Sequence, residues 1–347
     1  MEVPVQDIGQ GLAGDAQGGT AFYSDERWLN LIQTIYGYTV TRLEVHGADG
    51  ALRGYLPVCV LNSPLTGRRV VSLPFSDVCG LVASDTSAAH QLLDQAVELG
   101  RKHRARYVEL RTGPSVAVAE RDDFIASDNY VCWRIALAAG EERVWSEVQK
   151  PVQRQVRKSR KLGVSIRFAQ QREEMDIYHR LHVGTRSGKH GMPAQPRAFF
   201  RGLWDRFAED GTLQVLFAEH EGRAIAGMVL FAYGDTVRYA YGASEDKTLH
   251  LAPNNLLMWE SITWAISKGY QFFDMGRTAQ DNPGLMEFKR KWGASATPLP
   301  YYYWPRIAGL ASTSEASRKY QILTACWKRL PLPVASTLGG ALYKHLG

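Results

Sequence analysis

The sequence predicts a mixed α/β fold made of two tandem copies of one domain and a helical tail, because two stretches of the first half recur in the second. Residues 42–60 are similar to residues 216–232, and each stretch reads as a strand, a tight polar turn with glycine and another apolar strand. Residues 90–113 are similar to residues 255–278, and each reads as an amphipathic helix, a basic turn and a short apolar strand. A period of roughly 165–170 residues is too long for a solenoid and indicates a duplicated domain. The alternative is a chance match of two generic strand–helix–strand units.

Length and composition agree with a two-domain globular protein. The 347 residues exceed the usual size of one domain. A hydrophobic content of 45% with 22% charged residues is ordinary for a folded chain. No apolar run approaches the roughly 20 residues that a membrane-spanning helix needs. The net charge of +6 suits a phosphate-rich partner without proving one.

Breaks in the pattern divide the chain into four parts. A polar break at Gly140 separates the domains, and Trp145 begins the next helix. We expect a disordered leader at 1–20, a first domain at 21–143, a second domain with a basic entry helix at 144–306 and a helical tail at 307–347.

The leader and the cysteines indicate a cytoplasmic protein. The leader is acidic and rich in glycine, without the basic and apolar regions of a signal peptide. The cysteines are far apart and form no C-x-x-C pair: Cys59, Cys79, Cys132 and Cys326. We therefore expect no disulfide framework, no metal site and no cofactor.

The tail contains a predicted amphipathic helix at 318–330 that Pro331 and Pro333 end. Its apolar face consists of Ile322, Leu323, Trp327 and Leu330. Docking of this face on the body of the protein is the main interpretation. Peripheral contact with the inner face of a membrane is the alternative.

A strongly basic helix is predicted at 150–161. Lys150, Arg154, Arg157, Lys158 and Lys161 follow helical spacing on one face, and no acid interrupts them. Like charges on one stripe repel each other, and a merely solvated face normally contains Glu as well. We interpret Arg154, Arg157 and Lys158 as contacts for phosphates of a nucleic acid or nucleotide-linked substrate. A solvated basic face is the alternative.

Charged and aromatic residues of the second half gather where predicted elements meet. Tyr241 ends one strand, Asp274 and Arg277 end the next, and Lys289 lies on the following helix. A loop that opens a helix directly after a strand presents backbone N–H groups to an anion. The pattern is typical of a site where a phosphate-bearing acyl donor meets a nucleophile.

Several motifs resemble the FemABX family. They are R-x-x-R-K-x-x-K-x-G-V at 154–164, YGAS at 241–244, PNNLLMW at 253–259, FDMGR at 273–277 and FKRKWG at 288–293. Residues 72–80 and 320–339 add a closer similarity to FemAB-like proteins associated with exosortase/PEP-CTERM gene systems. The resemblance covers nearly the whole chain after Thr20.

The resemblance implies two GNAT-like domains in tandem and transfer of an acyl group to an amine. Characterised members of the family pass an aminoacyl group from aminoacyl-tRNA to an amine of a peptidoglycan precursor. Lys289 matches the lysine of the family's Phe-Lys pair, which is thought to stabilise charge on the reacting carbonyl. Tyr239 or Tyr241 matches a substrate-site tyrosine. The acid discussed as a general base has no clean counterpart, since Glu109 is offered but Gly113 stands where an acid often precedes the proline.

The predicted catalytic residues are therefore Lys289, Asp274 and Tyr241, each with a structural alternative. In the alternative interpretation, Lys289 is one of three consecutive basic surface residues, Asp274 pairs with Arg277, and Tyr241 is a core tyrosine. The predicted substrate-binding residues are Tyr239, Arg277, Phe288, Asn254, Asn255, Arg186, Arg154, Arg157 and Lys158.

Two loops refine the choice of donor. The loop at 246–255 has no glycine, which disfavours the close backbone approach that the pyrophosphate of coenzyme A requires. The loop at 182–193 contains Arg186 and either lines the substrate channel or is a solvent-exposed connection.

Three functions follow in order of preference. The first is transfer from aminoacyl-tRNA, or another phosphate-bearing donor, to an amine of a cell-envelope or exopolysaccharide precursor. The second is an acyl-thioester-dependent N-acyltransferase that acts on a sugar amine. The third is a non-catalytic adaptor of envelope assembly.

Overall fold

The computed structural model describes residues 22–64, 67–306, 324 and 327–345. The predicted leader and most of the predicted helix at 318–330 therefore lie outside the described residues. The chain divides into two compact units. The first comprises residues 1–130, 298–313 and 347, and the second comprises residues 131–297 and 314–346.

The first unit is built on one mixed sheet. Its strands, in spatial order, are β1 (Thr39–His46), β2 (Leu52–Ser63), β3 (Gly67–Val71), β5 (Val108–Leu110), β14 (Tyr301–Trp304) and β6 (Ile125–Ser127), and β4 (Val82–Ala83) pairs with β2. Its helices are α2 (Glu26–Tyr36), α3 (Thr86–Lys102) and α4 (Val116–Ala119). Helix α3 packs on the sheet through fully buried Leu92 and Leu93, and Asp85 caps its first turn by accepting from the Ala88 amide.

The second unit holds a second seven-stranded sheet. Its order is β13 (Ser295–Pro298), β7 (Tyr130–Ala136), β12 (Phe272–Ala279), β11 (Thr236–Ser244), β10 (Arg223–Tyr233), β9 (Leu213–His220) and β8 (Ser165–Phe168). Its helices are α5 (Glu141–Glu147), α6 (Lys150–Lys161), α7 (Glu174–Val183), the π-helix η1 (Gly184–Lys189), α8 (Arg197–Phe207), the 3₁₀ helix η2 (Asp246–Leu251), α9 (Pro253–Ser267), α10 (Pro283–Arg290) and α12 (Leu332–Tyr343).

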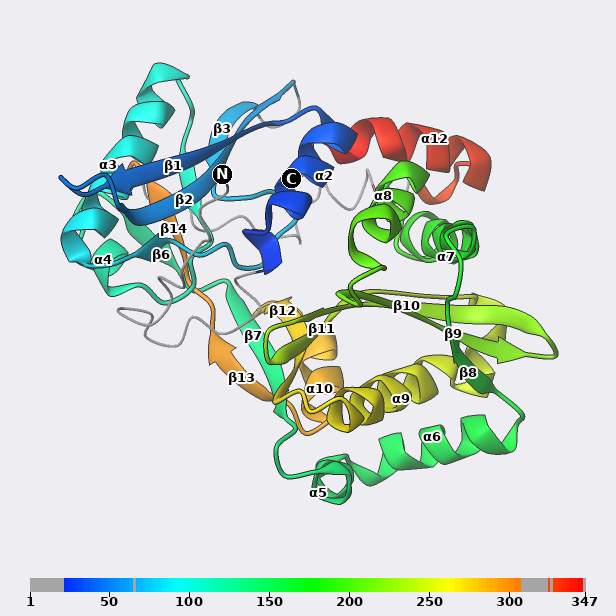
Figure 1. The fold of residues 1–347 in the computed structure, drawn as a ribbon. Helices are drawn as coiled ribbons and strands as arrows, with labels where there is room; N and C mark the ends of the chain where they lie inside the picture. Colours follow the sequence, from blue (N-terminus) through cyan, green and yellow to red (C-terminus); the bar gives the residue numbers. More distant parts are fainter. Residues whose placement is uncertain (1–21, 65–66, 307–323, 325–326, 346–347) are drawn as a thin grey trace. The chain divides into compact units, whose positions relative to one another are not determined.

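Helices cover both faces of the second sheet. Figure 1 shows α9, with α6 outside it, on one face and α7 with α8 on the other. Leu256 and Leu257 of α9 are buried against the sheet at the positions that match Leu92 and Leu93 of α3. Burial of such side chains stabilises a fold by about 1.5–3 kcal/mol each. The predicted mixed α/β duplication with a helical tail is confirmed.

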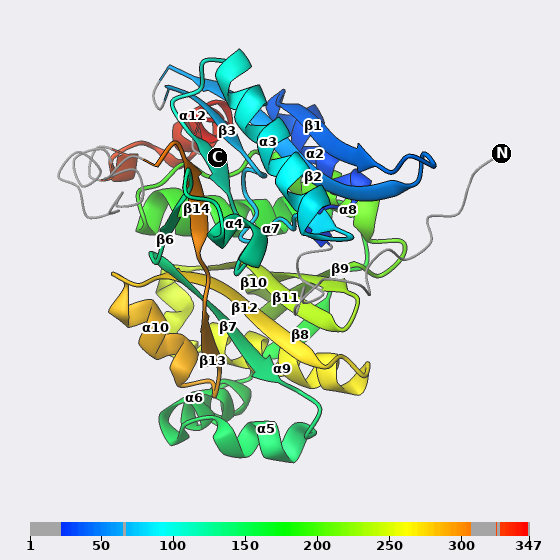
Figure 2. The same cartoon turned by 90° about the vertical axis from the view of Figure 1, so that its left-hand side faces the viewer.

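The two sheets do not follow the order of the sequence. Strand β7, which comes directly after β6 in the chain, lies in the second sheet between β12 and β13. Strand β14, which follows β13, lies in the first sheet between β5 and β6 and pairs antiparallel with both. Figure 2 shows β7 in the second sheet and β14 in the first. The units consequently divide at Val131 and Pro298, whereas the sequence pattern placed the breaks at 144 and 307.

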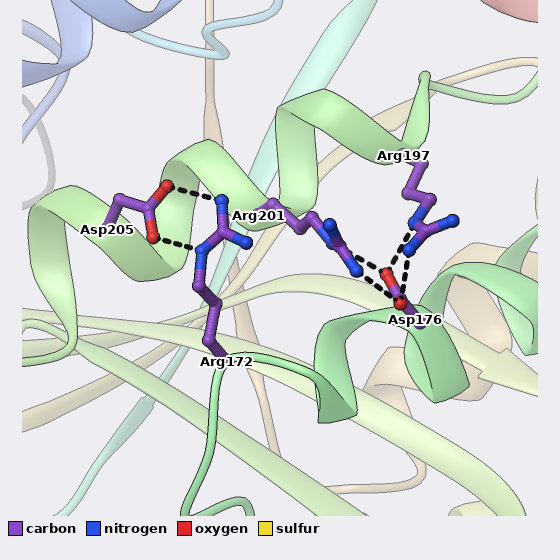
Figure 3. Close-up of polar contacts among 5 residues, drawn as sticks. All are labelled: Arg172, Asp176, Arg197, Arg201 and Asp205. Carbon is purple, nitrogen blue, oxygen red and sulfur yellow. Dashed lines mark hydrogen bonds and ion pairs between the residues drawn. The ribbon is translucent and has the colours of Figure 1, made fainter.

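Two ion-pair groups connect α7 and its preceding turn to α8 (Figure 3). Asp176 of α7 accepts two hydrogen bonds from Arg197 and two from Arg201, with distances of 2.6–2.9 Å. Arg172 donates to both carboxylate oxygens of Asp205 at 2.5 and 2.9 Å. Because the partners come from both elements, these contacts orient α8 along α7.

The tail packs on the second unit. Pro331 is the N-cap of α12 and Pro333 lies in its first turn, so the prolines begin this helix as well as ending what precedes it. Trp327 donates from its indole to Ser187 Oγ at 3.2 Å, and α12 contacts α7 and η1. Of the face that was predicted to dock, Trp327 makes this contact, and Ile322 and Leu323 lie outside the described residues. Within the described ranges, no helix has the length and apolar character needed to cross a bilayer.

Candidate functional site

The site lies in the second unit, where β11 and β12 separate. These parallel strands pair at three positions only, Thr236 with Phe272, Val237 with Phe273 and Arg238 with Asp274. Both strands are described throughout, and they continue to Ser244 and Ala279 without pairing with each other. Backbone groups on the facing edges beyond Asp274 are therefore free of ladder bonds to the neighbouring strand.

An ion pair lies where the ladder between β11 and β12 ends, and we call the unpaired stretch beyond it the opening. Asp274 is 1% exposed and accepts from Arg238 Nη1 at 2.8 Å. Its other oxygen accepts from the Gly276 amide at 2.7 Å and from the Cys132 thiol at 3.6 Å. The sequence alternative that paired Asp274 with Arg277 is wrong, since the register of β11 brings Arg238 opposite Asp274.

Lys289 is held at the β12 side of the opening. Its side chain is 3% exposed, and its ammonium donates to the carbonyl oxygens of Gly276 at 2.8 Å and Arg277 at 3.0 Å. Helix α10 begins at the Asn282 cap, which directs Lys289 back under the end of β12. The surface alternative for Lys289 is wrong, whereas its neighbours Arg290 and Lys291 do lie outside and pair with Glu287.

A β-bulge in β11 sends two tyrosines to opposite faces of the sheet. Leu230 pairs with Tyr239 and Val229 with Tyr241, so Ala240 is the extra residue. Tyr239 packs on the core beneath α9, and burial raises the pKa of its hydroxyl to about 12. Its hydroxyl lies directly against Gly242, where an added Cβ would be 2.0 Å from the oxygen.

Tyr241 faces α7 and α8 instead. Its ring packs edge-on against Phe199, Phe200 and Phe231 with centroids 5.8–6.3 Å apart. His182 of α7 approaches the same ring at 6.3 Å. Its aromatic surroundings agree with the core interpretation of this residue.

A chain of hydrogen bonds holds the C-terminal end of β11, where the opening ends. Thr185 of η1 exchanges hydrogen bonds with the backbone of Ser244, the last residue of β11. The Asn254 amide donates to Ser244 Oγ at 3.1 Å, which brings the start of α9 to the same place. Asn255, the next predicted residue, is half-buried one position further along α9.

The loop between β11 and α9 uses several of its own amide groups. The amides of Thr248, Ala252 and Asn255 donate to carbonyls of Glu245, Leu249 and Ala252 respectively. A pyrophosphate cradle needs several free amides in one concave loop. This loop is instead wound into the 3₁₀ helix η2, and it has no glycine.

A row of buried polar groups lies along α7 and η1. Tyr178, His182 and Arg186 are spaced by four residues, and the Tyr178 hydroxyl, His182 Nδ1 and Arg186 Nε are buried without a hydrogen-bond partner among the described residues. His182 Nε2 donates to Gln195 Oε1 at 2.6 Å. Burial, followed by the Arg186 guanidinium, lowers the pKa of His182 to about 3, so this imidazole is neutral.

Arg186 and Arg277 both act electrostatically on Tyr343 of α12. Burial raises the pKa of the Tyr343 phenol, and both guanidinium groups oppose that rise. Arg186 lies in a π-helix, an arrangement that often occurs at functional sites. The opening thus has positive charge on both its η1 side and its β12 side.

The remaining predicted residues lie outside this opening. Phe288 is 36% exposed on α10. Arg154, Arg157 and Lys158 are exposed on α6, which buries Val152 and Val156 against the body of the unit. Arg157 lies over Trp145 at 5.6 Å. The predicted basic face is confirmed, but the structure does not join it to the opening.

Sequence reasoning did not select Arg238, Tyr178, His182, Gly242 or Gly276. A detectable signal existed for Arg238, because the duplicated strand–helix–strand unit implies a parallel pair of strands. Gly276 adopts φ +75°, a backbone conformation that favours glycine. The glycine in the FDMGR motif was the sequence signal for this conformation. Among the described residues, no group of three or more His, Cys, Asp or Glu side chains could hold a metal ion.

Comparison with known proteins agrees with this geometry. Residues 146–290 match the model of the acetyltransferase (GNAT) domain family. This part of the second unit is therefore similar to the acetyltransferase domain of the GNAT class.

One segment of the chain is also similar to two named proteins. An 82-residue segment, 22% of this chain, is 33% identical to the Lipid II:glycine glycyltransferase of two Staphylococcus epidermidis strains. The matched segment spans only 20% of those curated relatives.

Solved structures show the same fold over most of the chain. FemX has a TM-score of 0.63 at 16% identity, covering 80% of this chain and 90% of that one. The L-PGS of Bacillus licheniformis has a TM-score of 0.57 at 12% identity, covering 92% and 98%. The fold that the FemABX resemblance implies is thus confirmed.

Proposed function

We propose that the second unit transfers an aminoacyl or related acyl group from an activated ester, with aminoacyl-tRNA as the donor, to an amine of a cell-envelope precursor. The observation that carries this proposal is the buried ammonium of Lys289, fixed beside the opening between β11 and β12. The segment similar to a Lipid II:glycine glycyltransferase supports the same chemistry. The second acceptor that we propose for the same reaction is an amine of an exopolysaccharide precursor.

The reaction requires a neutral amine and a stabilised oxyanion. The amine nitrogen attacks the ester carbonyl carbon, a C–N bond forms, and the carbonyl oxygen gains negative charge. When the C–O bond breaks, the proton lost by the amine ends on the departing ribose oxygen. The Lys289 ammonium places positive charge where the oxyanion develops, and a single preorganised donor of this kind contributes about 2.7–4 kcal/mol.

We assign Asp274 a positioning role. Both of its oxygens already accept hydrogen bonds, and its side chain is 1% exposed. Asp274 accepts a hydrogen bond from the Gly276 amide, and Lys289 donates one to the Gly276 carbonyl. The two side chains therefore hold the backbone of the same residue. An activated ester needs positioning more than a strong base.

Two features favour an RNA donor over an acyl thioester of coenzyme A. The loop before α9 has no glycine, and several of its backbone amides donate hydrogen bonds to carbonyls of the same loop. Helix α6 exposes Lys150, Arg154, Lys158 and Lys161, which have no ion pair within the described part of the chain. The match to an acetyltransferase family keeps a thioester donor as the second candidate.

The donor is tested by supplying purified protein with aminoacyl-tRNA or acyl-coenzyme A, each with an envelope-precursor extract. We expect labelled amide product from aminoacyl-tRNA, and none after ribonuclease treatment. Product from acyl-coenzyme A that is insensitive to ribonuclease would contradict the RNA donor and support the thioester reaction.

Charge reversal on α6 tests how RNA is held. The triple change Arg154→Glu, Arg157→Glu and Lys158→Glu should weaken tRNA binding and flatten its dependence on salt, by about 0.7–0.9 per lost phosphate contact in the logarithmic slope. The matched control is Arg160→Glu, because Arg160 already pairs with Glu260 at 2.6 Å. Equal tRNA affinity in the triple variant and in the wild type would remove α6 from the donor site.

A further inference from the structure

Helix α12 has an outer face that is apolar and uncovered. Val334 and Leu338 are 44% and 43% exposed on this face. Leu332, at the start of the helix, is 47% exposed but lies toward η1, where its Cδ2 would be 3.7 Å from a Cβ added at Gly188. Among the described residues, no other helix exposes as many large apolar side chains as these three on α12. Large apolar groups on a surface mark a contact with a partner or a membrane when they cluster.

The sequence of α12 separates a docking side from a free side. Ala335, Gly339 and Tyr343 face inward and are buried. Gly339 lies so close to the chain that an added Cβ would be 3.0 Å from the Ala194 amide nitrogen. Val334, Leu338 and Ala341 follow i, i+4, i+7 spacing on the opposite side, and all three are exposed.

Positive charge surrounds this apolar stripe. Helix α12 itself has no charged residue, Lys328 and Arg329 are exposed just before it, and Lys344 is exposed just after it. The last acid of the sequence is Glu315, so residues 316–347 contain five Lys or Arg and no Asp or Glu. An uncharged helix flanked by basic residues at both ends matches the surface of an anionic bilayer.

We propose that α12 is a peripheral membrane-binding helix whose Val334–Leu338 face inserts between lipids while Lys328, Arg329 and Lys344 contact anionic headgroups. Helix α6 does not have these properties, because its exposed face is basic without an apolar stripe. The proposal goes beyond the acyl-transfer reaction and holds whether or not that reaction is assigned correctly. It would place the enzyme where lipid-linked acceptors are found.

Co-sedimentation of the full-length protein with vesicles tests the proposal. We expect binding to vesicles of phosphatidylcholine mixed with phosphatidylglycerol, weaker binding to phosphatidylcholine alone, and partial release by salt. The double variant Val334→Ser with Leu338→Ser should lower the partition coefficient at least about tenfold. The matched control is Val116→Ser, an apolar residue of the first unit that is 74% exposed, and it should bind like the wild type.

A second variant keeps the test informative if the serine variant misfolds. Lys328→Gln with Arg329→Gln leaves the apolar face intact and should weaken binding to anionic vesicles selectively. Binding that is absent in the wild type, or unchanged in both folded variants, would overturn the proposal. A wild-type dimer in light scattering that Val334→Ser with Leu338→Ser converts to monomer, without vesicle binding, would instead assign the face to a second copy of the chain.

Discussion

Tyr239 and Gly242 are a pair in which one residue leaves room for the other. The tyrosine hydroxyl occupies the space that any side chain at 242 would fill, with 2.0 Å to an added Cβ. Real Cβ atoms do not approach so closely, and the three nearest atoms all belong to the Tyr239 side chain. The position of the tyrosine at the edge of the β11–β12 opening therefore depends on the glycine.

We predict that Gly242→Ala displaces the Tyr239 ring and slows acyl transfer by about tenfold or more, with a loss of about 1–3 kcal/mol in unfolding free energy from overpacking. Steady-state transfer rates and urea unfolding measure the two effects. Gly284→Ala is the control, because its Cβ would meet only Asn282 Oδ1, at 3.9 Å. An unchanged transfer rate in Gly242→Ala would show that Tyr239 has no part in the site.

His182 makes stability depend on pH. Burial lowers its pKa to about 3 from the ordinary 6.5. Between these two pH values, the imidazole is therefore protonated in the unfolded chain and neutral in the folded chain. The stabilisation is present above pH 6.5 and is lost as pH falls toward 3, by about 2 kcal/mol already at pH 5.

We therefore expect His182→Gln to lose about 2 kcal/mol less than the wild type in unfolding free energy between pH 7 and pH 5. Urea unfolding at the two values measures the difference, with His250→Gln on the surface as the control. Parallel losses in the wild type and His182→Gln would mean that the imidazole is charged in the folded state.

Individual residues were predictable where a motif or a strand end selected them. Lys289 follows from the FKRKWG motif, and the structure gives it two carbonyl partners that no sequence pattern shows. Arg238 was missed because its partner is 36 residues away, and only the register of two parallel strands brings them together. Asp274 was selected as an acid that ends an apolar strand, whereas the structure places it inside β12, and its hydrogen-bond partners depend on that register.

At the scale of elements, the hairpins and the two long helices were predictable because each is a local pattern. The order of the strands was not. β7 and β14 contribute short apolar segments whose neighbours lie far away in sequence, so alternation alone cannot assign them to a sheet. The same limit applies to η1, since no local pattern distinguishes a π-helix from a polar loop.

The clamp between α7 and α8 gives a prediction at this scale. Asp176 joins two arginines of α8, whereas Asp205 joins one arginine. Asp176→Asn should lower the unfolding free energy by about 1 kcal/mol and Asp205→Asn by about half as much, since partly exposed pairs contribute little each. Urea unfolding in low salt compares them. A larger loss in Asp205→Asn would show that the Asp176 network does not hold α8.

At the scale of the whole molecule, duplication has left two different strand junctions. In the first unit, β3 and β5 also pair in parallel, at Val70 with Val108 and Val71 with Glu109. The chain beyond them stays bonded, because Arg111 donates to the carbonyls of Leu73 and Ser76 and its own carbonyl accepts from the Cys79 amide. In the first unit, the chain beyond β3 and β5 is thus joined by its own hydrogen bonds, whereas the equivalent stretch between β11 and β12 of the second unit is unpaired.

The buried Glu109–Arg111 pair, at 2.6 Å, extends this comparison. Glu109 holds the register position of Asp274, because it pairs with Val71 of β3 as Asp274 pairs with Arg238 of β11. Its arginine partner, however, follows it in the same segment instead of lying on the neighbouring strand.

The central claim is that the Lys289 ammonium stabilises the transition state of acyl transfer. It is tested most directly by the single-turnover rate of Lys289→Ala with the donor that the ribonuclease experiment identifies. We predict a fall of about 10²–10³-fold, while Lys291→Ala, on the same helix and paired with Glu287, keeps the wild-type rate. A folded Lys289→Ala enzyme within about threefold of the wild-type rate would contradict the account.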